Sequence, residues 1–131
     1  MRPPRPDRHR RRTIRAAWRT EVDTARTARR AGRPDVEWTH LERAHIVSQP
    51  LALTHTATHA LMLANGLRRR DGREIGGQLF RLLVAGPGSI TRRYPIGNTG
   101  SAAVSPYAPM PIPADLETVL GTNQPETGDN P

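Results

Sequence analysis

Four of the five histidines of this 131-residue chain lie within twenty residues, in two segments that follow one another closely. The first segment contains His40 and His45, and the second contains His55 and His59. Neutral imidazole binds transition metals, and imidazole also exchanges protons near neutral pH. The histidine cluster is therefore the best candidate in the sequence for a functional site.

The spacing of these residues favours a metal site. His55 and His59 are four positions apart, so a helix would place both imidazoles on one face, where they could share an ion. Glu42 and His45 are three positions apart, a spacing that carboxylate metal sites in helical bundles use. Pro50 ends the first of these two helices, and almost no loop separates it from the next. The two helices should therefore pack antiparallel and bring His45 towards His55. We predict a site for Zn, Fe, Mn or Ni whose ligands are Glu42, His45, His55 and His59.

Three further side chains are predicted to contact a ligand in this region. On a helix with 100° per residue, Trp38 and Gln49 lie within about 60° of the sector that contains His45. Glu21 lies on the apolar side of an earlier predicted helix, where a carboxylate is unusual. His40, in contrast, points about 140° away from His45 and should not share its site.

A hydrogen-bonded polar core is the simpler interpretation of the same residues. Glu21 and Glu42 could pair with Arg or His from neighbouring helices, and imidazole packs well when both of its nitrogens have partners. A third interpretation is a metal-free active site with His45 as the base and Glu42 as the orienting acid. Hydrolysis of the zinc-peptidase kind is disfavoured, because position 56 is Thr where those enzymes have Glu.

The positive charge of the chain is concentrated at its N-terminus. The net charge is +8, and residues 1–33 carry 12 Arg against three acidic residues. Residues 1–12 have no apolar face and three prolines, so we expect a disordered Arg-rich arm that could contact nucleic acid or another polyanion through charge. The absence of cysteine excludes disulfides and thiolate metal sites.

The apolar periodicity predicts an all-α fold, a small antiparallel bundle of about four helices with an extended Pro-rich C-terminal segment. Pro and Gly end most of the helical stretches. The expected domain covers residues 13–120, with a disordered tail at 121–131. The predicted helices are 13–31, 35–49, 51–70 and 73–85, with a short fifth helix at 114–120.

The fourth predicted helix carries two stripes. Its apolar stripe, Ile75, Leu79, Leu82 and Leu83, is expected to face the core. The opposite stripe, formed by Glu74, Gln78 and Arg81, is expected to face solvent.

Residues 97–100, Gly-Asn-Thr-Gly, indicate a tight turn with positive φ. The Lys and the following helix of a phosphate-binding loop are missing, so we interpret the segment as a structural turn. With its Leu-Glu-Arg-Ala-His stretch at 41–45 and this turn, the chain resembles an uncharacterised family of short bacterial proteins, a domain of unknown function. The resemblance covers about residues 38–113 and implies a bacterial origin and a small helical fold. It implies no activity, cofactor or partner.

The sequence assigns no reaction, so whether the chain is an enzyme stays open. Residues 51–67 contain two His and four other polar residues, which argues against a membrane span and favours a cytoplasmic protein. Our first hypothesis is a small intracellular protein that binds a metal ion or small ligand through the His/Glu cluster. The alternative is a helical protein-interaction module with a basic arm, and paired helices with short turns are also typical of tetratricopeptide-like repeats.

Overall fold

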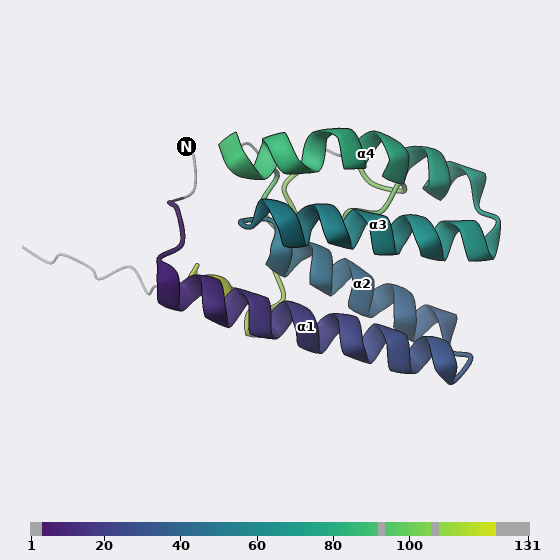
Figure 1. Cartoon of the computed structure of the whole chain (residues 1–131), viewed down its shortest axis with the longest axis horizontal. Coiled ribbons are helices and arrows are strands. Elements are labelled where there is room, and N and C mark those ends of the chain that lie inside the picture. Colours follow the sequence, from purple (N-terminus) through teal and green to yellow (C-terminus); the bar gives the residue numbers. More distant parts are fainter. Residues whose placement is uncertain (1–3, 92–93, 106–107, 123–131) are drawn as a thin grey trace, which may run out of the picture.

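A computed structural model describes residues 4–91, 94–105 and 108–122. These residues form five helices and no strand, which confirms the predicted all-α class. Figure 1 shows the first four helices side by side, with α1 packed on α2, α2 on α3 and α3 on α4. Most of the predicted tail lies outside the described residues. The helices are α1 (Arg8–Arg30), α2 (Pro34–Ser48), α3 (Ala52–Arg69), α4 (Gly72–Thr91) and α5 (Ala114–Leu120).

The α1 helix begins at Arg8, five residues before the predicted start. The side chain of Asp7 caps it by accepting a hydrogen bond from the backbone N–H of Arg10 at 2.7 Å. The guanidinium of Arg10 also donates to two backbone carbonyls in the last turn of α5. Because arginine is a good helix former and this helix start is capped, residues 8–12 are helical and do not form the extended arm that we predicted.

The α4 helix continues past the Gly-Pro-Gly stretch that we expected to end it. Pro87 lies inside the helix, which runs on to Thr91. Proline has a helical φ, but it removes its own N–H bond and its ring crowds the carbonyl four residues earlier, so it usually kinks or breaks a helix; here the helix continues on both sides of Pro87. In the added turn the Thr91 hydroxyl donates to the Pro87 carbonyl at 2.8 Å.

The apolar core is small and divided into two clusters. The first joins α1, α2 and α5, and the second joins α1, α2 and α3. Polar side chains, including all three histidines of the segment 45–59, are buried beside these clusters. The first cluster consists of Ile14, Ile46, Val47, Leu51 and Leu116, and the second of Ala25, Leu41 and Met62.

The polar stripe of α4 faces inward, contrary to the prediction, and the apolar stripe is only partly covered, with Ile75 and Leu82 half-buried. Glu74, Gln78 and Arg81 are buried, whereas the side chains of Leu79 and Leu83 are 52% and 77% exposed. The cause is the segment 98–104, which lies against the polar stripe and offers its backbone groups as partners. One guanidinium nitrogen of Arg81, for example, donates to two carbonyls of this segment at 2.8 and 2.9 Å.

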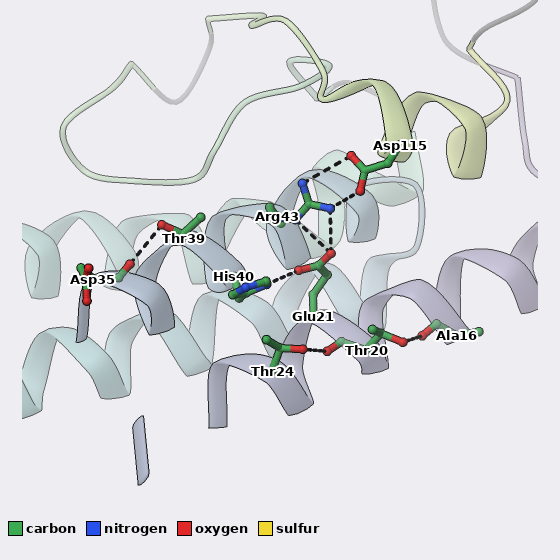
Figure 2. A network of polar contacts seen from close by, with 9 residues as sticks. All are labelled: Ala16, Thr20, Glu21, Thr24, Asp35, Thr39, His40, Arg43 and Asp115. Carbon is green, nitrogen blue, oxygen red and sulfur yellow. Dashed lines mark hydrogen bonds and ion pairs between the residues drawn. The ribbon is translucent and has the colours of Figure 1, made fainter. Parts of the chain in front are cut away.

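A polar network fastens α1, α2 and α5 together (Figure 2). The carboxylate of Glu21 on α1 accepts hydrogen bonds from Nδ1 of His40 at 2.6 Å and from Nε of Arg43 at 3.0 Å. Arg43 also pairs with Asp115 on α5. The side chain of Glu21 is only 10% exposed, so these partners offset the cost of burying its charge.

Replacing Arg43 by glutamine should lower the free energy of unfolding by about 2 kcal/mol, because Glu21 would keep a buried charge without its guanidinium partner. Urea denaturation measures this change. Arg26→Gln is the matched control, since the Arg26–Asp23 pair is 56% and 73% exposed and should contribute less than about 0.5 kcal/mol. Equal losses in the two variants would show that the network does not hold the helices together.

No helix in the described part of the chain has the length and apolar character needed to cross a membrane.

Candidate metal centre

Three of the four predicted metal ligands meet in the interior. His45 comes from α2, and His55 and His59 come from successive turns of α3. Nε2 of His45 lies 2.9 Å from Nε2 of His55 and 3.1 Å from Nε2 of His59. The three side chains are at most 5% exposed, and one nitrogen from each lies within 4.8 Å of the others. We call His45, His55 and His59 the histidine cluster.

Hydrogen bonds determine the tautomers of two of these imidazoles. Nδ1 of His45 lies 2.7 Å from the backbone oxygen of Asn98, and Nδ1 of His59 lies 2.6 Å from Oε1 of Gln78. A carbonyl oxygen only accepts, so Nδ1 must carry the proton in both rings. In the neutral imidazole Nε2 then carries a lone pair.

The amide of Gln78 is oriented by two further bonds. Its Nε2 donates to Oε1 of Glu74 at 2.6 Å and to the backbone oxygen of Gly100 at 2.8 Å. Oε1 of the amide therefore faces His59. In metal sites, a histidine ligand typically donates its other ring N–H to an acceptor that fixes the tautomer. Oε1 of Gln78 is in the corresponding position relative to His59.

The Nε2 atoms of His45 and His59 consequently face one another as two acceptors 3.1 Å apart. Two lone pairs in this position repel, and a cation that both can bind removes the repulsion. A tetrahedral zinc ion with bonds of 2.0–2.1 Å holds its nitrogen ligands about 3.3 Å apart. The two distances from Nε2 of His45, 2.9 Å to His55 and 3.1 Å to His59, are close to that value.

Protonation of one imidazole would also remove the repulsion, but the surroundings of the histidine cluster disfavour it. Burial, followed by the proximity of His55 and His59, lowers the pKa of His45 well below its usual value. Burial also lowers the pKa of His59 to about 4, although the bond to Gln78 acts in the opposite direction. Both rings are therefore neutral at pH 7, which is the form that binds metal ions.

Acid should destabilise the metal-free protein. The pKa of His59 is 6.5 without the native environment and about 4 within it, so between these pH values the unfolded chain binds more protons than the folded one. The free energy of unfolding then falls as the pH decreases from 6.5 to 4, and His59 alone accounts for about 3 kcal/mol of this fall. Urea midpoints measured with chelator at pH 7, 6, 5 and 4.5 test the slope.

His59→Gln should reduce this pH dependence, and His9→Gln should not, because His9 is an exposed residue of α1. Identical slopes in the wild type and His59→Gln would contradict the assignment.

The Gly-Asn-Thr-Gly turn positions the backbone oxygen that His45 contacts. Oδ1 of Asn98 accepts a hydrogen bond from the backbone N–H of Gly100 at 2.9 Å. Nδ2 of the same side chain donates to two backbone carbonyls, each at 2.8 Å. Gln49 fixes the other side of the turn, because its amide bonds to the Pro95 oxygen and to the Gly97 N–H. The turn is thus part of the support of the histidine cluster.

Gly100 also packs against the imidazole of His45. It has a φ of +80°, and a Cβ atom at this position would lie 2.6 Å from two ring carbons of His45. Only glycine allows the turn to approach the ring so closely. The prediction of positive φ in this segment holds at Gly97 and Gly100.

The other predicted site residues have separate surroundings. Glu21 belongs to the network of Figure 2. Glu42 is half-buried and lies outside the group of three histidines; burial raises the pKa of its carboxyl, and the nearby charge of Glu74 acts in the same direction. Trp38 packs against the second apolar cluster and has the guanidinium of Arg69 5.8 Å above its ring. Gln49 is linked to the histidines through the turn, and Glu42 lies near the same turn, because Thr99 influences the pKa of its carboxyl.

Sequence reasoning missed Gln78 and the turn as partners of the histidines. Gln78 was placed on the solvent side of its helix because Glu74 and Arg81 share its stripe. The turn was recognised, but nothing in its local sequence indicates contact with a residue about fifty positions earlier. The alignment of Glu74 with Gln78 at a spacing of four was the available signal for an oriented amide.

The described residues form an all-helical protein with a buried cluster of three histidines. The chain belongs to the family described as "Protein of unknown function (DUF3703)", whose model matches residues 12–120. This confirms the expected membership of a domain family of unknown function. No curated protein and no solved structure matches the chain.

Proposed function

We propose that this protein binds one divalent transition-metal ion through the Nε2 atoms of His45, His55 and His59. The observation that supports this proposal most strongly is the pair of Nδ1–H bonds to Asn98 and Gln78. These bonds direct two lone pairs towards each other in a buried space. A hydrogen-bonded core would instead need a donor on one of the two nitrogens.

Three imidazoles without a thiolate suit zinc, iron or nickel, with manganese as a weaker candidate because it prefers oxygen ligands. Three protein ligands leave a fourth position for water or another small ligand. In this proposal Glu42 and Glu74 act as nearby carboxylates that offset the charge of the ion. Glu74 contacts Gln78 directly, and the raised pKa of Glu42 should fall when a cation is bound.

The proposed ion has a role in holding the bundle together. Neither of the two cavities of about 430 and 540 Å³ is lined by a histidine, and the cluster itself joins α2 to α3. An ion that binds only the folded chain adds its binding free energy to stability, about 2.7 kcal/mol at a free concentration 100 times its dissociation constant. We therefore expect a protein whose fold depends on metal supply.

Metal titration tests the proposal. The chelator-treated wild type should bind one Zn²⁺ per chain in an assay against a chromophoric competitor, and so should the control His9→Gln. The double variant His55→Gln/His59→Gln should bind none, while circular dichroism confirms that it remains helical. A wild type with no affinity above that of the double variant would refute the proposal.

A further inference from the structure

A groove of about 540 Å³ lies where α1, the start of α3 and the end of α4 meet, and the histidine cluster does not line it. Three of its basic residues, Arg11, Arg15 and Arg19, follow one another on α1 at intervals of four. This spacing places them along one side of the helix. No acidic residue is among the lining residues. The basic residues are Arg5, Arg11, Arg15 and Arg19.

Most of this positive charge is uncompensated. Arg11 donates to the backbone oxygen of Pro6 at 3.0 Å. The side chains of Arg5, Arg15 and Arg19 have no ion-pair or hydrogen-bond partner among the described residues. Guanidinium groups bind phosphate and carboxylate with two parallel hydrogen bonds, so an anion in the groove would gain several charge-assisted bonds.

The start of α3 adds further donors. Ala52, Leu53 and Thr54 are the first three residues of this helix, and all three line the groove. The N–H groups of the first turn have no acceptor within a helix, and the preceding residue Leu51 provides no side-chain cap. The positive end of the helix dipole therefore also favours an anion.

The same groove has an apolar side. Leu53 is 85% exposed and Ile90 is 64% exposed, and both line it together with Trp18. Exposed aliphatic side chains next to uncompensated arginines match a ligand that is charged at one end and apolar along its body. A sugar or a hydrated inorganic ion would leave the leucine and isoleucine in water.

We propose that this groove binds an amphipathic anion. The arginines and the first turn of α3 would hold a phosphate or carboxylate head, and a hydrocarbon chain would lie along Leu53 and Ile90. Free acyl or alkyl anions and anionic lipids in a bilayer share this chemistry. The proposal uses no residue of the histidine cluster.

Titration calorimetry with dodecyl phosphate below its micelle concentration tests the proposal. The wild type should bind one molecule, with little binding of inorganic phosphate or of dodecyltrimethylammonium at the same concentrations. Arg15→Gln/Arg19→Gln should weaken binding at least about tenfold through lost charge-assisted bonds. Arg12→Gln/Arg30→Gln is the matched control: it removes the same charge from exposed sites of the same helix outside the groove.

Leu53→Ser tests the apolar side of the groove separately. It should weaken the binding of dodecyl phosphate without affecting the fold, because Leu53 is exposed. Cosedimentation with phosphatidylglycerol vesicles then identifies the source of the ligand: vesicle binding that needs Arg15 and Arg19 indicates a bilayer lipid, and monomer binding alone indicates a free anion. Equal losses in the two double-arginine variants, or equally tight binding of dodecyltrimethylammonium, would overturn the proposal.

Discussion

Replacing His45 by asparagine is expected to abolish the thermal stabilisation that Zn²⁺ gives to the wild type. The wild type should gain roughly 10 °C in Tm at a zinc concentration 100 times the dissociation constant, which corresponds to about 2.7 kcal/mol. His45 lies between the other two imidazoles, with its Nε2 within 3.1 Å of both. Without its ring only two protein ligands remain, and the imidazole that contacts both of the others is lost. Scanning calorimetry with and without zinc measures the effect.

His40→Gln is the control for this experiment. His40 lies on the same helix and bonds to Glu21, so its replacement should lower Tm. The zinc-induced increase should nevertheless remain, because His40 has no contact with the cluster. A His45→Asn protein that still responds to zinc like the wild type, or a His40→Gln protein that does not respond, would contradict the assignment of ligands.

Gly100→Ala is expected to weaken metal binding about 10- to 100-fold, although Gly100 is not a ligand. The new Cβ would lie 2.6 Å from the ring of His45, so the imidazole or the turn must move. Either movement disturbs the bond from Nδ1 to Asn98, and loss of such supporting contacts usually costs metal sites this much affinity. The free energy of unfolding of the metal-free protein should also fall by about 1–3 kcal/mol. Competitor titration and urea denaturation measure the two effects.

Gly32→Ala is the control for Gly100→Ala, because it imposes a similar cost on the backbone conformation without bringing a Cβ atom against a neighbouring side chain. Gly32 has a φ of +67°, close to that of Gly100, but a Cβ atom at this position would have no neighbouring atom within 4 Å. This variant should lose about 1 kcal/mol of stability through the left-handed conformation alone and keep the full metal affinity. If Gly100→Ala lost no more affinity than Gly32→Ala, the turn would have no role in positioning His45.

The helices were predictable because their signals are local. Apolar stripes and Gly or Pro at the ends placed α2 and α3 within about one residue of their observed bounds. The start of α1 was missed although Asp7 is a local capping signal, and the contact of Arg10 with α5 is a long-range one that local sequence does not indicate. The end of α4 was missed because Gly and Pro usually end a helix, whereas this helix continues past Pro87 to Thr91.

The histidine cluster was predictable from spacing, but its support was not. A spacing of four and a short connection indicated that His55 and His59 would meet His45. Whether the polar or the apolar stripe of α4 faces inward depends on what packs against it, and the segment 98–104 supplied the buried acceptors and donors. Glu21 follows the alternative interpretation, because His40 and Arg43 satisfy it without a metal.

The interpretation as a hydrogen-bonded core explains part of the histidine cluster as well. It accounts for the Nδ1 atoms of His45 and His59, each of which has a carbonyl partner. It leaves the facing Nε2 lone pairs without an explanation, because both rings are neutral at pH 7. The metal proposal accounts for both nitrogens of His45 and of His59.

A crystal structure of the protein grown with Zn²⁺, with diffraction data collected on both sides of the zinc absorption edge, tests the metal proposal most directly. We predict one anomalous peak per chain, about 2.0–2.1 Å from the Nε2 atoms of His45, His55 and His59. Anomalous peaks found only at surface residues, with the three imidazoles in direct contact and no peak between them, would contradict it.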